Sequence, residues 1–243
     1  MAFAILRMSK QKGGNIGALD KHHEREKEAY QSNPDIDPAR THLNHHLKEP
    51  QGRYYYEVQR RIEAAHCRVR SDSVKMVDVY IGASPGFVKE LPAEEQMEFF
   101  RHALAFMERK VGADNIFVAL VHEDETNPHM HLCFVPLTPD NRLSAKEILG
   151  NRKDMCRWQD EYHAHMSARW PDLERGEPAV ETQRKHQPVQ EYKRTHQSPE
   201  FIELWQQHER LRRRWQRVPY EIRKDIVDSE LAKKQMRERN FER

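Results

Sequence analysis

IFVALVHEDETNPHMHLCFVP is the sequence of residues 116–136, and this stretch decides the fold. It consists of two apolar runs, each about as long as a buried strand, joined by a short polar loop. Because side chains alternate across a strand, His129 and His131 fall on one face of the second run and Met130 on the other. The stretch therefore predicts two neighbouring strands with imidazoles on one face and the protein core on the opposite face.

A third imidazole belongs to the same predicted strand pair. His122 follows the first apolar run, residues 116–121, and the loop after it brings the chain back toward His129 and His131. Three neutral imidazoles bind Mn²⁺, Co²⁺, Ni²⁺ or Zn²⁺ more readily than Mg²⁺, which prefers oxygen ligands. We expect a divalent metal site with Mn²⁺ as its working ion and Mg²⁺ as an alternative through its abundance.

Two other interpretations of these histidines stay open. Histidines at alternate positions occur in strands that bind no metal. Structural zinc takes four ligands, often including a thiolate, and Cys133 shares the face of His131. A structural zinc site completed by Cys133 is therefore an alternative to an open catalytic site.

The order of residues in this stretch is more specific than its histidines alone. It fits the pattern His-x-Asp-Glu-x-x-Pro-His-x-His followed by apolar residues and Pro, at His122, Asp124, Glu125, Pro128, His129, His131 and Pro136. This resembles the His-hydrophobic-His (HUH) signature of relaxases and rolling-circle initiators, and in particular the plasmid mobilisation and recombination (Mob/Pre) family.

Other segments carry the same resemblance in the family's order over about the first two hundred residues. Near the N-terminus a Gly-Asn pair precedes a Lys-His and an Arg. The matching residues are Gly14, Asn15, Lys21, His22 and Arg25, then Arg40 to Asn44 (RTHLN), Arg70, Asp72 and Val74, Leu143, Ser144 and Lys146, and Leu173 to Gly176 (LERG).

The fold expected from the alternation of elements is α+β, with an antiparallel sheet and helices packed on one face. The resemblance implies the same architecture, a ferredoxin-like palm whose open face holds metal and DNA. The predicted elements are strands at 2–7 and 74–81, helices at 54–66 and from Pro92 to Gly112, and one helix from the capping box at Ser144 to Trp170.

The nucleophile is implied by the resemblance, which places a histidine nucleophile on His22. Its attack on a DNA phosphodiester would leave a phosphoramidate. Glu125 is expected to accept a proton or to orient that ring. Asp124 is expected to accept a hydrogen bond from a metal-binding histidine and so to fix its orientation. The alternative histidines are His42, which lies in a matched segment, and then His23, His45 and His46. The alternative tyrosines are Tyr30 and those at 54–56; where some relatives have a tyrosine, this chain has His45.

The formal net charge of +2 does not by itself indicate a nucleic-acid partner. The first 21 residues, however, hold four basic residues against one acid, a distribution that suits a phosphate backbone. We expect plasmid origin-of-transfer DNA, single-stranded or in a hairpin, as the partner. The expected DNA contacts are Arg7, Lys12, Asn15, Lys21, Arg25 and Arg70.

The chain is expected to divide into a catalytic domain, residues 1–195, and a charged helical extension, residues 196–243, which continues into a longer C-terminal region or supports a homodimer. Three cysteines without a Cys-x-x-Cys spacing fit a reducing compartment. No apolar stretch is long enough to cross a bilayer. We expect a protein of the bacterial cytoplasm, without membrane insertion, that works with a conjugative coupling protein and type IV secretion machinery.

Three functions follow from these observations. The first is a relaxase that nicks one strand at a plasmid transfer origin and later rejoins the ends. The second is a rolling-circle replication initiator with the same chemistry. The third is a non-enzymatic DNA-binding protein with a structural metal.

Overall fold

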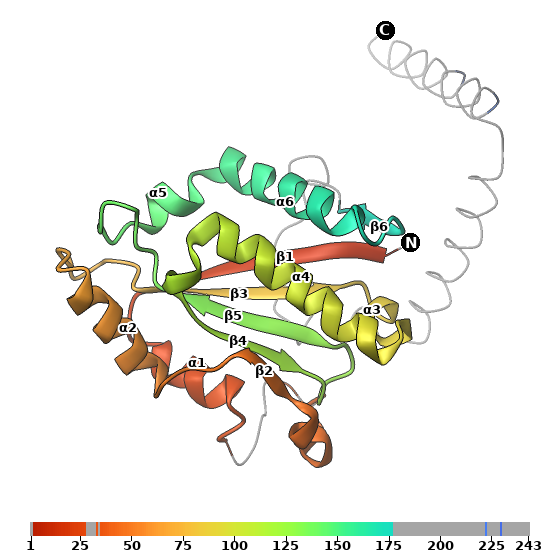
Figure 1. Ribbon diagram of the computed structural model, residues 1–243, viewed down its shortest axis with the longest axis horizontal. Helices are drawn as coiled ribbons and strands as arrows, with labels where there is room; N and C mark the ends of the chain where they lie inside the picture. The colour runs from red at the N-terminus through yellow and green to blue at the C-terminus, as the bar shows by residue number, and fades with distance from the viewer. Residues whose placement is uncertain (1, 28–32, 34, 177–221, 223–228, 230–243) are drawn as a thin grey trace, which may run out of the picture. The chain divides into compact units, whose positions relative to one another are not determined.

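The computed structural model describes residues 2–27, 33, 35–176, 222 and 229, and shows one sheet with helices (Figure 1). The sheet has six strands in the order β2-β4-β5-β3-β1-β6. The strands are β1 Ala2–Gln11, β2 His45–Lys48, β3 Met76–Ala83, β4 Ile116–His122, β5 His129–Phe134 and β6 Leu173–Arg175. All neighbours pair antiparallel except β1 and β6, which pair parallel, so the expected antiparallel sheet is confirmed.

β5 lies in the interior of the sheet, between β4 and β3. Its register places His129 opposite His122 of β4, and His131 opposite Tyr80 of β3. Directly opposed residues share a face of an antiparallel pair. The predicted return of the chain beside His122 is therefore what the strand pairing shows.

The main core fills the face of the sheet that carries Met130. Met130 is fully buried there together with apolar residues of β1, β3 and β4. Four helices contribute to the same cluster: α3 Phe87–Glu90, α4 Ala93–Val111, α5 Ala145–Leu149 and α6 Arg152–Ser167. Burial of each large apolar side chain in such a cluster contributes about 1.5–3 kcal/mol.

Besides the helices packed on the core face, as predicted, two further helices cover part of the other face. Ile16 of α1, Ile16–His23, and three residues of α2, Tyr54–Ala64, form a second buried cluster with Phe117 and Leu120 of β4. α2 has an apolar side made by Tyr54, Val58 and Ile62, which must be buried against something. α1 and α2 thus cover part of the face that carries the histidines.

The predicted helix from Ser144 to Trp170 is in fact two helices. α5, Ala145–Leu149, ends at Gly150, which has φ +72°, a conformation that favours glycine. α6 then begins with its own capping box, in which Asn151 and Asp154 bond each other's backbone N–H groups. The glycine and the capping box therefore divide the segment into two helices, although the helical spacing of apolar residues continues through both.

Several predictions fall outside the described residues: the boundary between residues 195 and 196, the charged helices after it, and Tyr30. The prediction missed four short elements of the described residues. They are the strands β2 and β6 and the 3-10 helices Pro38–Leu43 and Ala113–Asn115. In the described part of the chain, no helix combines the length and the apolar character that crossing a bilayer requires.

Candidate metal centre and active site

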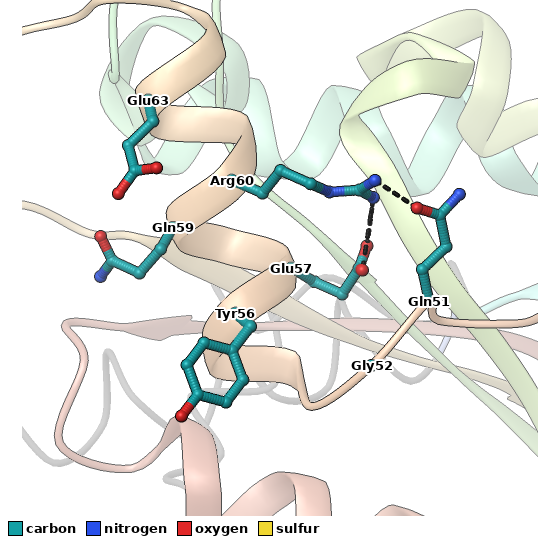
Figure 2. Close-up of a pocket in the computed structure, with 7 residues that line it drawn as sticks. All are labelled: Gln51, Gly52, Tyr56, Glu57, Gln59, Arg60 and Glu63. Atoms are coloured by element: carbon teal, nitrogen blue, oxygen red, sulfur yellow. Dashed lines mark hydrogen bonds and ion pairs between the residues drawn. The ribbon is translucent and has the colours of Figure 1, made fainter.

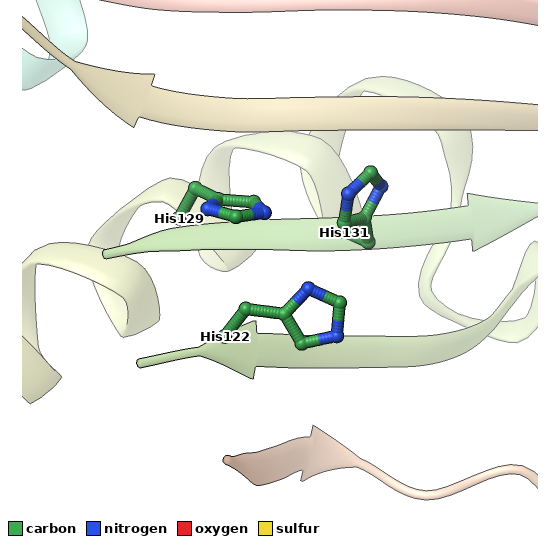
Figure 3. A group of neighbouring side chains, drawn as sticks. All are labelled: His122, His129 and His131. Carbon is green, nitrogen blue, oxygen red and sulfur yellow. The ribbon is translucent and has the colours of Figure 1, made fainter. Parts of the chain in front are cut away.

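His122, His129 and His131 meet on the face of the sheet opposite the main core (Figure 3). One ring nitrogen of each lies within 4.8 Å of the others, and the three ring centroids are 5.2–5.3 Å apart. His122 and His129 are almost entirely buried, and His131 is half-buried. The predicted grouping of three imidazoles is thus present.

Backbone carbonyls hold two of these rings in place. His122 Nε2 lies 2.9 Å from the carbonyl oxygen of His23, and His129 Nδ1 lies 2.9 Å from that of Asn127. A nitrogen that donates to a carbonyl carries the proton, so the other nitrogen keeps its lone pair. Such contacts set the tautomer and the orientation of metal-binding histidines.

Asp78 holds the third ring. Its Oδ1 lies 3.0 Å from His131 Nδ1, which leaves Nε2 of His131 as the nitrogen with a lone pair. We predicted this role for Asp124, and that prediction is wrong. The available signal was an acid alternating with valines in the predicted strand at 74–81, on the face that β3 shares with the histidines.

The donor set fits a divalent cation. His122 Nδ1 is buried and has no hydrogen-bond partner, which costs free energy unless another group uses its lone pair. A cation bound by three imidazoles with further positions open is a catalytic arrangement rather than a closed structural one. Among the described residues no cysteine belongs to a group with this spacing, and Cys133 Sγ instead lies 3.8 Å from Asp78 Oδ1. The geometry therefore disfavours a structural zinc site completed by Cys133.

The N-terminal segment brings His22 to this centre. β1 ends at Gln11, the chain turns at Gly13, whose φ of +130° favours glycine, and α1 then carries His22 in its last turn. The ring of His22 lies 6.5 Å from that of His131 and nearly perpendicular to it. Burial, reinforced by the positive charge of Arg25, lowers the pKa of His22 to about 4. His22 is therefore neutral at pH 7.

Arg25 connects α1 to the loop after β4. It donates to both carboxylate oxygens of Asp124 at 2.8 Å, to Glu125 Oε1 at 2.8 Å and to the backbone carbonyl of His22 at 2.9 Å. Its side chain is only 3% exposed. Two carboxylates thus occupy its guanidinium, and the contact of Arg25 with DNA phosphate stays a prediction.

Glu125 lies between Arg25 and the histidine centre. Its Oε1 is 3.8 Å from His129 Nε2, and its Oε2 accepts a hydrogen bond of 2.8 Å from Asn33. Its link to His22 runs through Arg25, which bonds both residues. Glu125 is thus at the predicted site.

The tyrosine candidates are placed less favourably than His22. Tyr54 is fully buried, and its hydroxyl donates to Glu24 at 2.8 Å; burial raises the pKa of this phenol further above its usual value. Tyr55 and Tyr56 are exposed and contact each other, with ring centroids 5.7 Å apart. His42 is exposed in the 3-10 helix Pro38–Leu43.

Tyr80 is a further aromatic residue at the site that the sequence analysis did not select. Its ring stacks on His129 with a centroid distance of 4.8 Å and an interplanar angle of 23°. Burial raises the pKa of Tyr80. In the strand register Arg7 lies opposite Tyr80, which lies opposite His131, so Arg7 shares the histidine face.

The other residues expected to contact DNA are at the surface. Arg7 is exposed on β1, and Asn15, which precedes α1, makes no side-chain capping bond. Lys12, Lys21 and Arg70 are exposed as well. Their contact with DNA stays a prediction.

A separate hollow lies beside α2 (Figure 2). Its lining residues are Gln51, Gly52, Tyr56, Glu57, Gln59, Arg60 and Glu63. Arg60 donates hydrogen bonds to both Gln51 and Glu57, so the charges of Arg60 and Glu57 are already paired. This hollow includes none of the histidines of the candidate centre.

An antiparallel sheet whose inner strands carry a three-histidine group, with a fourth histidine presented by the N-terminal helix, defines a candidate metal-dependent enzyme. The sequence profile of the plasmid recombination enzyme family, Mob_Pre, matches residues 1–194. The chain belongs to this family, which confirms the resemblance.

Individual relatives agree with this assignment. Plasmid recombination enzyme type 3 of Mammaliicoccus lentus is 37% identical over 198 residues, which are 79% of this chain and 48% of that protein. A plasmid recombination enzyme of Bacillus thuringiensis is 34% identical over 193 residues, 79% of this chain and 42% of its own length. The chain thus spans about half the length of the curated relatives that it matches.

A solved structure is similar over most of the chain. The relaxase domain of MobM, crystallised with Mn and plasmid pMV158 oriT DNA, is 32% identical and has a TM-score of 0.73. The match covers 79% of this chain and 98% of that domain. The similarity confirms that the sheet and helices have the architecture of a relaxase domain.

Proposed function

We propose that this chain contains the catalytic domain of a DNA relaxase, which cuts one strand at a plasmid transfer origin, stays covalently attached and later rejoins the ends. The observation that carries the proposal is the position of the His22 ring, 6.5 Å from the ring of His131 in the three-histidine group. Family membership and the oriT DNA bound to MobM support it.

The metal would be held by His122, His129 and His131. When bound there, a divalent ion polarises the scissile phosphate and offsets the charge that develops in the transition state. Mn²⁺ is the proposed ion, because imidazole ligands favour it over Mg²⁺ and because the MobM crystals contain Mn.

His22 is the proposed nucleophile. Its lowered pKa leaves one ring nitrogen with a lone pair at neutral pH. Attack forms a nitrogen–phosphorus bond and breaks the bond from phosphorus to the 3′ oxygen, which takes up a proton; the ring proton passes to a base. The products are a phosphoramidate on the 5′ side and a free 3′-hydroxyl, and the reverse reaction rejoins the strand.

Arg25 and Glu125 are proposed to position this nucleophile. Arg25 fixes the backbone of His22 by its bond to the carbonyl oxygen, and Glu125 holds Arg25 from the other side. The carboxylate of Glu125 is also the base proposed to receive the ring proton, since its negative charge raises the pKa of His22.

The remaining parts of the proposal concern partners. Origin DNA, single-stranded or in a hairpin, would lie along the histidine face with phosphate contacts from Arg7, Lys12, Asn15, Lys21 and Arg70. A conjugative coupling protein and type IV secretion machinery are further proposed partners, with the chain in the bacterial cytoplasm. The catalytic domain would span residues 1–195, and the extension after it would support a homodimer.

The test is to nick supercoiled DNA that carries the cognate transfer origin in Mn²⁺ and to identify the peptide bound to the DNA by mass spectrometry. We expect the adduct on His22, resistant to alkali and labile in mild acid. His22→Ala should abolish the adduct while DNA binding remains, and His42→Ala should change neither. An adduct on a tyrosine peptide would refute the histidine mechanism. Cleavage of a replication origin in place of the transfer origin would favour the rolling-circle initiator.

A further inference from the structure

A second group of metal-binding side chains lies next to the three-histidine centre and shares one residue with it. His23, Asp78 and His131 place one ligand atom each within 4.8 Å of one another. His23 belongs to α1, Asp78 to β3 and His131 to β5, so three elements distant in sequence supply this inner group. Two imidazoles and a carboxylate form a donor set that suits Zn²⁺.

His23 is the residue whose environment is otherwise unexplained. Its side chain is fully buried, and neither ring nitrogen has a hydrogen-bond partner. Its Nε2 lies 3.8 Å from Asp78 Oδ1, too far for a hydrogen bond, and its ring centroid is 4.1 Å from that of His131. Leaving a polar side chain buried and unpaired costs free energy. A cation between these side chains would take up the unused lone pair of His23.

We propose that His23, Asp78 and His131 form an inner cation site that takes Zn²⁺ and competes with the catalytic centre for His131. The competition follows from the chemistry of imidazole, which has one lone pair on nitrogen when it is neutral. His131 Nδ1 faces Asp78. An ion bound at Nδ1 leaves the proton on Nε2, and Nε2 is the nitrogen that the outer centre needs.

The ligand set explains why the inner site suits zinc. Two imidazoles and one carboxylate, with a fourth position for water, form a tetrahedral arrangement that Zn²⁺ takes in proteins. The inner ligands are enclosed, since the Asp78 side chain is 11% exposed and that of His131 13%. A zinc-loaded chain would thus be a distinct state with its outer centre incomplete. This inference rests on the proposed role of His131 as a ligand of the working metal.

The two groups can be separated by substitution, because each has ligands that the other lacks. His122→Ala and His129→Ala each remove a ligand of the outer centre only and leave all three inner ligands. We expect both variants to bind one Zn²⁺ per chain in equilibrium dialysis. Adding His23→Ala to either variant should weaken this binding by more than about a hundredfold, the upper end of the loss expected for an outer-shell partner. His42→Ala, at an exposed histidine outside both groups, is the matched control and should leave Zn²⁺ binding unchanged.

Two results would overturn the proposal. Loss of Zn²⁺ binding in both His122→Ala and His129→Ala, in chains whose circular dichroism matches the wild type, would show that the inner group binds no zinc. Two Zn²⁺ ions on one wild-type chain would show that the sites do not compete. Nicking by the Mn²⁺-loaded wild-type chain tests the proposed function separately, so either idea can fail alone.

Discussion

Arg25 forms two hydrogen bonds of 2.8 Å with the carboxylate of Asp124, although the two residues are 99 positions apart in the chain. Both side chains are buried, with 3% and 0% exposed. The pair joins the end of α1, which carries His22, to the loop that follows β4 and its His122. This buried ion pair therefore helps to hold the proposed nucleophile beside the proposed metal ligands, together with the contact between His122 Nε2 and the His23 carbonyl.

Breaking this ion pair should be costly. We expect Arg25→Met to lower the free energy of unfolding in urea by about 3–5 kcal/mol, because Asp124 is then left buried and unpaired. Arg25→Lys keeps the charge but loses the two-bond geometry and should also destabilise. The double variant Arg25→Met with Asp124→Leu should be more stable than Arg25→Met alone. Equal losses in the single and double variants would show that the pair itself does not matter.

Metal removal should lower stability by mass action. At a Mn²⁺ concentration a hundred times its dissociation constant, we expect the free energy of unfolding to rise by about 2.7 kcal/mol, and a chelator should reverse the gain. Differential scanning calorimetry measures this effect. His129→Ala should show no such gain, and a gain of the same size in that variant would place the ion elsewhere.

The metal-free chain should lose stability as the pH falls below about 6.5. Burial lowers the pKa of His129 and of His22 to about 4 and keeps the pKa values of His23 and His122 well below the usual range. Between pH 6.5 and 4 the unfolded chain therefore binds more protons than the folded chain, so acid favours unfolding. Stability should be complete above pH 6.5 and fall by up to about 1.4 kcal/mol per pH unit for a fully buried histidine.

Urea unfolding of the metal-free chain at several pH values measures this dependence. His129→Gln removes one of the buried histidines and should reduce the slope. His42→Gln, which changes an exposed histidine, should keep the wild-type slope. A flat stability profile between pH 7 and 4 would contradict the burial of these rings.

Tyr54→Phe separates a structural tyrosine from a catalytic one. The hydroxyl of Tyr54 donates to Glu24, which also lies 3.2 Å from His46 Nε2. We expect a loss of about 1–2 kcal/mol in the free energy of unfolding and an unchanged yield of covalent DNA adduct on a denaturing gel. Loss of the adduct from a folded Tyr54→Phe chain would transfer the nucleophile to this residue.

Met130→Ala tests the two faces of β5 separately. Met130 is fully buried in the main core, so its truncation should cost about 2–5 kcal/mol. Mn²⁺ affinity, measured by titration calorimetry below the melting temperature, should stay close to that of the wild type because His129 and His131 point to the other face. A selective loss of Mn²⁺ binding would show that the two faces are coupled.

Local patterns predict much of this fold. Alternation placed His129 and His131 on one face and Met130 on the other, and the register of β4 and β5 confirms it. Pro92 and Gly112 bound α4 as expected. The strands β2 and β6 were missed because segments of four and three residues carry too little periodicity to be recognised.

Tertiary contacts account for what the sequence did not predict. The position of Asp78 in a predicted strand was a usable signal, but only the pairing of β3 with β5 places its carboxylate against the ring of His131. Asp124 is instead paired with Arg25. His23 was considered only as a spare nucleophile beside His22, yet its ring lies nearer to His131, with a centroid distance of 4.1 Å against 6.5 Å for His22. The second cluster under α1 and α2 likewise depends on where those helices dock.

Because the side chains of β5 alternate between the core and the histidine group, the spacing of its residues matters more than the identity of its apolar side chains. Met130, Leu132 and Phe134 all belong to the main core, and apolar exchanges of similar volume there are tolerated at modest cost. A single-residue insertion between His129 and His131 would instead rotate every later side chain to the opposite side of the sheet. Such an insertion would turn the His131 imidazole into the apolar core and an apolar side chain toward the proposed metal site. One added residue would therefore disrupt both the core packing and the histidine group.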